Sequence, residues 1–166
     1  MDIKKTVIIK ASAKQAWQVL GEGYGEVGTW IVSLSQSSME GEVGVGGIRV
    51  CTGLGFGPFP ASVVKERLID FDAQSYSFRY EAFTGLPAII KSAQNAWKID
   101  PQGQNQCCIK MHAQIQLKWW ARPLGILIPW LMAKDFNLLE EEMVYRIEQG
   151  RPHPRKLKAL STAGAA

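Results

Sequence analysis

The chain has 166 residues, of which 46% are hydrophobic and 20% charged, a balance that excludes disorder and suits one globular domain. Its net charge is +4, but no aromatic residues alternate with the basic ones, so we expect no nucleic-acid partner. The longest apolar stretch, residues 123–133, is shorter than the roughly 20 residues that cross a bilayer. Neither a secretory h-region nor a CxxC motif occurs, which predicts a cytoplasmic protein.

The first part of the chain is expected to hold one strand and one or two short helices. Residues 3–10 are rich in β-branched side chains, which are typical of a strand. Ser12 and Gln15 have the spacing of a capping box, so a helix is predicted to begin there. Glycines between residues 21 and 28 interrupt the pattern, and a second short helix is expected near residues 26–31.

The middle of the chain alternates apolar and polar residues in short segments, which is typical of an antiparallel meander. Turn-forming residues separate the segments, for example at 70–72 and 100–103. Six strands are predicted, near residues 32–40, 46–54, 61–70, 74–83, 89–99 and 106–118.

A long amphipathic helix is predicted to close the domain. Pro129 suits its first turn, and Gly150 is a typical C-terminal residue. Apolar side chains recur three or four positions apart, at Ile128, Met132, Phe136, Leu139, Met143 and Ile147. We expect one domain over residues 1–150, with this helix across the concave face of one curved sheet. Residues 151–166 are predicted to form a basic, flexible tail.

Three short segments carry a family signature: ASAKQAW at 11–17, GVGGIR at 44–49, and ERL at 66–68 leading into Phe71 and Asp72. In this order they resemble the START-like (SRPBCC) superfamily, and most closely its polyketide cyclase/dehydrase and lipid-transport branch. The resemblance implies an α+β, helix-grip fold, with a curved antiparallel sheet of about seven strands wrapped around a long C-terminal helix. It also implies an internal cavity for a small apolar or amphipathic molecule.

A more distant similarity is to the plant abscisic-acid receptors of the same superfamily. GPFPA at 57–61 and TGLP at 84–87 stand where those receptors carry a gate loop and a latch, and Glu66 matches a glutamate that lines their pocket. Val32 stands in place of their ligand-pairing lysine, and the latch lacks their histidine. The similarity therefore implies a cavity mouth between two loops that contain Gly and Pro, without recognition of a carboxylate hormone.

Glu66 is the candidate polar centre of the cavity. Strand alternation places it on the face opposite Lys65 and Arg67. If those cationic side chains face solvent, Glu66 points into the cavity; the alternative is that Glu66 lies on the convex face. A buried carboxylate is costly unless it is protonated or paired, so an inward Glu66 requires a partner such as Arg49 or Tyr80.

The strand that contains Arg49 has two interpretations. Alternation alone places the apolar Ile48 and Val50 inside the sheet. The family resemblance instead places Arg49 and Cys51 inside. The need of Glu66 for a charged partner favours the second interpretation.

The strand near residues 89–99 is also ambiguous. Its apolar pattern favours Trp97 and Ile99 as inward residues, whereas the family resemblance favours Ser92 and Gln94. We leave Trp97 out of the candidate site for this reason.

The leading functional hypothesis is a protein that binds or transports a small hydrophobic or amphipathic molecule. The alternative is a cyclase or dehydratase for a polyketide-like or aromatic substrate, with Glu66 as general acid or base. No His, Cys or acidic residues have metal-ligand spacing, and we expect neither a metal nor a cofactor. The candidate ligand-binding residues are Arg49, Phe59, Glu66, Phe78, Tyr80, Leu86, Met111, Phe136, Leu139 and Met143.

Residues 119–133 contain Trp119, Trp120, Trp130 and the long apolar stretch. One interpretation is a weak contact with a membrane surface, assisted by the basic tail. Others are that the segment covers the cavity mouth, covers the end of the sheet, or forms a dimer contact. The sequence leaves monomer and homodimer open.

Overall fold

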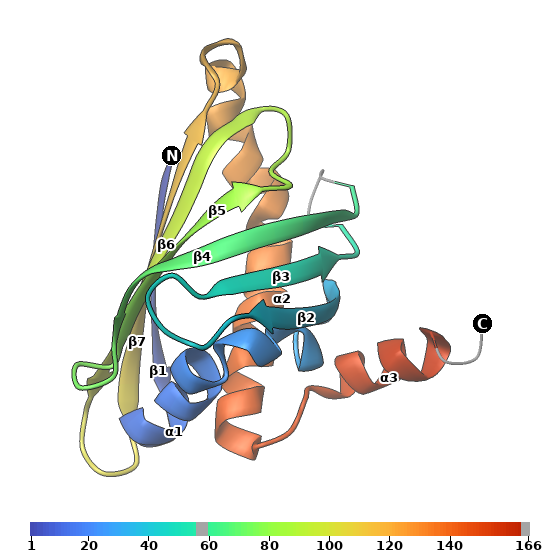
Figure 1. Ribbon diagram of the computed structural model, residues 1–166. Helices are drawn as coiled ribbons and strands as arrows, with labels where there is room; N and C mark the ends of the chain where they lie inside the picture. Colours follow the sequence, from blue (N-terminus) through green and yellow to red (C-terminus); the bar gives the residue numbers. More distant parts are fainter. Residues whose placement is uncertain (56–59, 164–166) are drawn as a thin grey trace.

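A seven-stranded antiparallel sheet, curved around a long helix, forms the frame of the protein (Figure 1). The computed structural model describes residues 1–55 and 60–163. The strands are β1 (Asp2–Ile9), β2 (Leu34–Glu40), β3 (Ile48–Gly53), β4 (Ser62–Asp72), β5 (Ser77–Thr84), β6 (Ile90–Pro101) and β7 (Cys107–Leu117). The helical segments are α1 (Ala13–Trp17), η1 (Gln18–Glu22), η2 (Tyr24–Thr29), η3 (Trp119–Ile126), α2 (Leu127–Gln149) and α3 (Pro154–Ala163).

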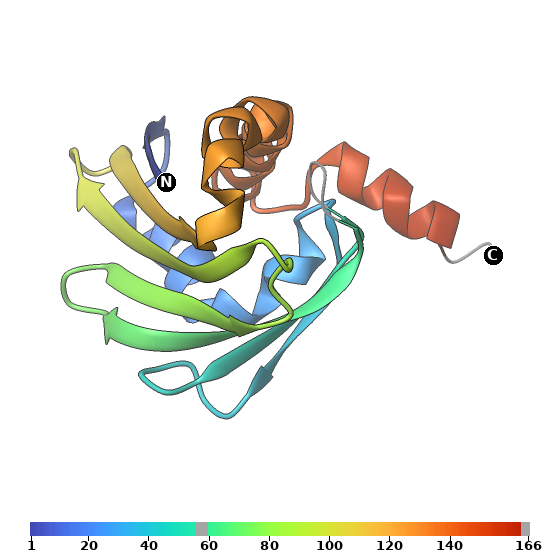
Figure 2. The same ribbon diagram turned by 90° about the horizontal axis from the view of Figure 1, so that it is seen from above.

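The sheet order is β1-β7-β6-β5-β4-β3-β2, so β1 crosses over to pair with the last strand. Seen from above, the sheet forms a trough with α2 lying over its open side (Figure 2). Two register shifts in the pairing of β4 with β5, one between Lys65 and Glu66 and one between Leu68 and Asp70, add curvature at the middle of the sheet. This architecture is the helix-grip fold that the sequence predicts.

The local signals at both ends of the helical segments are confirmed. Ser12 and Gln15 form the expected capping box at the start of α1. Gly150 ends α2 with φ of +68°, a left-handed conformation that glycine adopts without steric cost. The chain between α1 and β2 is more helical than predicted, since η1 and η2 continue almost directly from α1.

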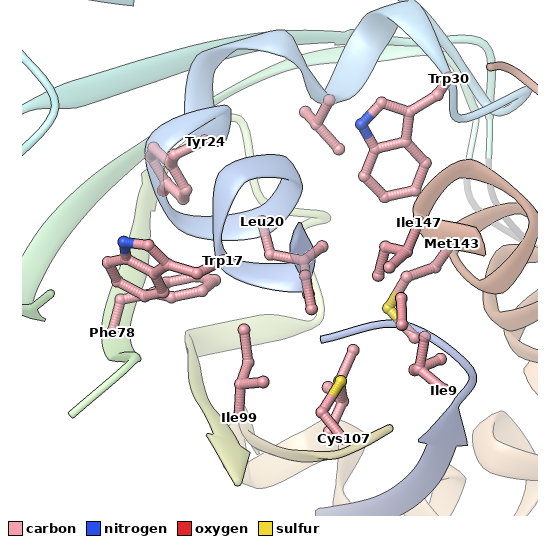
Figure 3. Packing of buried hydrophobic residues seen from close by; sticks show 14 of the residues in the cluster. Ile9, Trp17, Leu20, Tyr24, Trp30, Phe78, Ile99, Cys107, Met143 and Ile147 are labelled. Carbon is pink, nitrogen blue, oxygen red and sulfur yellow. The ribbon is translucent and has the colours of Figure 1, made fainter. Parts of the chain in front are cut away.

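The hydrophobic core lies between the short N-terminal helices, the sheet and the C-terminal half of α2 (Figure 3). Trp17 is nearly fully buried and packs its ring 5.0 Å from Phe71 and 6.0 Å from Phe78. Met143 and Ile147 bring α2 to the same cluster. Tyr24, Phe78 and Met143 belong both to this core and to the wall of the cavity described below, so the cavity adjoins the core.

The C-terminal segment differs from the flexible tail that the sequence predicts. Residues 154–163 form α3, and Lys156 is buried against the rest of the domain. Its Nζ donates hydrogen bonds to the carbonyl oxygens of Ile31 (3.0 Å) and Leu34 (2.7 Å). Burial lowers the pKa of Lys156, and the nearby Glu142 carboxylate partly offsets this effect. The basic composition of this segment predicted a solvated tail, but Lys156 instead holds it against the domain.

We expect Lys156→Ala to lower the free energy of unfolding by about 2 kcal/mol, because two buried carbonyl groups lose a charge-assisted donor. Urea denaturation provides the measurement. The control is Lys14→Ala, which removes an exposed helical lysine and should change stability by less than about 0.5 kcal/mol. Equal stability of both variants would show that α3 is not anchored by Lys156.

Candidate ligand-binding cavity

A cavity of about 360 Å³ lies between the concave face of the sheet and the middle of α2. Side chains from η2, from strands β3 to β7 and from α2 form its wall. Eight of the predicted residues line it, namely Arg49, Glu66, Phe78, Tyr80, Met111, Phe136, Leu139 and Met143. Whether they touch a ligand stays a prediction.

Two predicted residues are not part of this wall. Phe59 lies outside the described residues. Leu86 is half-buried but does not line the cavity, and the next residue, Pro87, does. The reason is the turn at Gly85, whose φ is +79° and where a Cβ atom would lie 1.8 Å from the carbonyl oxygen of Val63. The chain reverses in this close contact, and the sequence does not show which of the following residues then faces inward.

Arg49 and Glu66 form an ion pair in the cavity wall. They are direct cross-strand neighbours on β3 and β4, and Nη2 of Arg49 lies 2.6 Å from Oε2 of Glu66. Nε of Arg49 donates a second hydrogen bond to the same oxygen at 2.8 Å, while Nη1 donates to the Tyr24 carbonyl at 2.9 Å. The side chains are only 9% and 15% exposed. The inward interpretation of both residues is confirmed, and the outward one for Glu66 is wrong.

Aromatic rings enclose the guanidinium group of Arg49. Its Cζ lies 3.9 Å from the centroid of the Tyr24 ring and 5.0 Å from that of Tyr80, within the range of cation–π interaction. Burial lowers the pKa of Arg49, but the Glu66 carboxylate, together with Tyr24, Tyr80 and Cys51, more than offsets it, and the net shift is upward. The guanidinium therefore stays charged, and each of its three nitrogens contacts a group within the protein.

The other ionisable groups around this pair are neutral at physiological pH. Burial raises the pKa of Cys51 to about 12, and it raises the pKa of the Tyr24 and Tyr80 hydroxyls as well. The Cys51 thiol lies 3.7 Å from Oε2 of Glu66. The cavity thus contains one compensated charge pair surrounded by neutral polar groups.

Three buried polar atoms in the cavity wall make no hydrogen bond of regular geometry among the described residues. They are the Tyr24 hydroxyl, Oδ1 of Asn95 and the indole Nε1 of Trp97, and the indole is close enough to the Tyr80 hydroxyl to counter part of the rise in its pKa. Asn95 pairs with Tyr80 across β5 and β6, and Trp97 pairs with Phe78, so these side chains share one region of the concave face. Each unpaired buried group costs roughly 1–3 kcal/mol, which a bound polar group would recover.

The inward residues of β6 follow its apolar pattern, not the family resemblance. Trp97 lines the cavity and stacks on Phe78 with ring centroids 6.0 Å apart, and Ile99 is completely buried. Neither Ser92 nor Gln94 lines the cavity. Trp97, which was left out of the candidate site, therefore belongs to the cavity wall, and the alternation of apolar residues is the signal that would have included it.

The sequence also gave no reason to include the η2 region in the site. Tyr24, Val27, Trp30 and Ile31 all line the cavity, and Figure 3 shows Tyr24 and Trp30 pointing inward from this part of the chain. The sequence predicted only a second short helix near residues 26–31, among several glycines. Their inward position depends on how η2 packs against the sheet, which no local pattern reveals.

The described residues contain no group of three or more His, Cys, Asp or Glu side chains able to hold a metal ion. His112 lies on the outer face of β7, where its Nε2 is 2.9 Å from the Asp2 carboxylate. The cavity wall, as far as the structure describes it, contains one carboxylate and no histidine.

A curved sheet that grips a helix around an apolar cavity defines the helix-grip class of the START-like superfamily. Residues 1–144 match the model of the family described as polyketide cyclase / dehydrase and lipid transport, and the chain belongs to that family. A search of curated proteins found no match.

Several solved structures share this fold. Zhui aromatase/cyclase from Streptomyces sp. R1128 is 14% identical with a TM-score of 0.69, covering 92% of this chain and 99% of that one. Norcoclaurine synthase from Thalictrum flavum, in complex with dopamine and hydroxybenzaldehyde, is 18% identical with a TM-score of 0.66, covering 92% and 89%. A protein of Thermus thermophilus is 13% identical with a TM-score of 0.71, covering 89% and 97%. At these identities the similarity shows the fold.

Proposed function

We propose that the protein binds or carries a small, predominantly apolar molecule in the cavity between its sheet and α2. The observation that carries this proposal is the cavity itself, whose volume of about 360 Å³ falls within the roughly 300–1,000 Å³ of small-molecule sites. Its aromatic and Met side chains adapt to flat and irregular apolar shapes. The family and the fold of its solved neighbours support such a role.

The unpaired polar atoms suggest what else the ligand carries. Nε1 of Trp97 is a donor, Oδ1 of Asn95 is an acceptor, and the Tyr24 hydroxyl is both. A hydroxyl group on the ligand can accept from the indole and donate to the amide oxygen. The proposed ligand is therefore an apolar molecule with a hydroxyl or comparable neutral polar group, such as a phenol or a sterol-like alcohol.

A cyclase or dehydratase is the second candidate, favoured by the presence of Glu66 and Tyr80 in the same cavity and by the aromatase/cyclase among the structural neighbours. The geometry supports it less well. General acid–base catalysis needs a group that exchanges a proton with the substrate. Oε2 of Glu66 is occupied by two contacts from Arg49, and no second carboxylate or histidine lines the described wall. Binding is the function that this arrangement supports best.

The test is whether the folded protein takes up an environment-sensitive apolar dye. We expect binding at one site per chain, and a rise of about 5–10 °C in the melting temperature at roughly a hundred times the dissociation constant. Fluorescence titration and thermal denaturation measure the two effects. Dye fluorescence that increases only during unfolding would contradict the proposal. Native mass spectrometry of freshly purified protein would identify a bound molecule directly.

A further inference from the structure

The segment in which η3 meets the first turn of α2 lies at the end of the molecule opposite α1 (Figure 1), and several of its large apolar side chains are exposed. The most exposed are Ile126 at 90%, Trp119 at 79% and Trp130 at 74%. We call this the tryptophan surface; it consists of Trp119, Trp120, Leu124, Ile126, Leu127 and Trp130, all of them exposed. Leaving so many large apolar groups in water is unfavourable, and it marks a surface for interaction.

The tryptophan surface does not cover the cavity. Within residues 116–135, no described side chain belongs to the cavity wall, and only Ala121 and Ile128 are buried. The described side chains of this segment therefore give no support to its interpretation as a mouth cover. No helix in the described part of the chain has the length and apolarity needed to cross a bilayer. The side chains of the tryptophan surface are exposed on the outside of the domain.

The charged residues between positions 116 and 134 are all basic, and the first acidic residue after them is Asp135. Residues 101–134 contain no Asp or Glu, and the exposed Lys118, Arg122 and Lys134 flank the apolar side chains. Exposed tryptophans beside basic residues are typical of segments that lie in the interface of an anionic bilayer. A symmetric dimer through the same surface would bring each basic side chain close to those of its copy, which is unfavourable.

The position of the tryptophan surface links it to the cavity. Ile90 lines the cavity and pairs with Leu117, the last residue of β7 before η3. The backbone N–H of Lys118 also donates to the Ile89 carbonyl at 2.9 Å. The rim of the cavity and the tryptophan surface are thus joined by the ends of β6 and β7.

We infer that the protein docks on anionic lipid bilayers through the tryptophan surface, with the rim of its cavity close to the lipid. The basic α3 does not contribute, because it follows the opposite end of α2, a helix whose 23 residues extend about 34 Å (Figure 1). The sequence-based idea that the basic tail assists membrane contact is not supported by this arrangement.

The test is co-sedimentation with phosphatidylcholine vesicles that do or do not contain phosphatidylserine. We expect binding only when the anionic lipid is present, release in high salt, and a loss of about tenfold or more in the double variant Trp119→Ser/Trp130→Ser. The charge variant Arg122→Glu should weaken binding in the same direction. The matched control is Leu157→Ser/Leu160→Ser, which removes exposed apolar side chains of α3 and should bind like the parent.

Three outcomes would overturn the inference: no sedimentation with anionic vesicles, equal loss in the α3 control, or light scattering that shows a dimer which Trp119→Ser/Trp130→Ser dissociates. Dye binding and melting temperature of each variant show that it is folded. Since the substituted residues are outside the cavity wall, dye binding should be unchanged. Membrane docking and ligand binding can therefore fail independently of each other.

Discussion

Arg49→Met is expected to lower the free energy of unfolding by about 3 kcal/mol. The substitution keeps an unbranched side chain of similar length, but it leaves the buried Glu66 carboxylate without its charge partner. It also removes the donor to the Tyr24 carbonyl and the cation between two aromatic rings. Urea denaturation monitored by circular dichroism measures the loss.

Two further variants make this result specific. Arg49→Met combined with Glu66→Leu removes both charges and should recover at least half of the loss, because an apolar pair no longer leaves a charge uncompensated. The exposed pair Lys65 and Glu40, with a distance of 2.7 Å, lies next to the buried one. Lys65→Met should cost less than about 1 kcal/mol. If the Arg49 and Lys65 variants lose the same stability, the buried pair is not a structural element of the cavity wall.

Leu139→Trp is expected to weaken dye binding by about tenfold or more. Leu139 is on α2 and lines the cavity across from the sheet, so an indole at this position extends into the space that a ligand would occupy. A tenfold change corresponds to about 1.4 kcal/mol of binding free energy. Fluorescence titration of the folded variant measures the dissociation constant.

Comparing dye affinity for a larger and a smaller side chain at position 139 distinguishes a filled cavity from a damaged protein. Leu139→Ala enlarges the same space, so it should bind the dye more tightly than Leu139→Trp does, even though the cavity it creates lowers its stability. Gln149→Trp places an indole on an exposed position of the same helix and should bind like the parent. Unchanged affinity in Leu139→Trp would mean that the dye binds elsewhere.

The order of secondary structure could be predicted from the sequence because its signals are local. The capping box at Ser12, the left-handed residue at Gly150 and the period-two strands each depend on neighbours within a few residues. The resemblance carried by the three family segments predicted the curved sheet and the helix-grip arrangement. Eight of the ten candidate residues line the cavity, because α2 presents one apolar face and β5 and β7 alternate clearly.

Only the tertiary structure decided which side of the irregular strands faces inward. In β3 the charged Arg49 is inside because Glu66 pairs with it across the ladder, a contact that apolar alternation argues against. At the latch loop, the close approach of Gly85 to Val63 turns Pro87 inward instead of Leu86. Composition likewise predicted a solvated tail, yet Lys156 is anchored on the carbonyl groups of Ile31 and Leu34. In each case the position depends on a partner far away in the sequence, and local periodicity carries no information about such a partner.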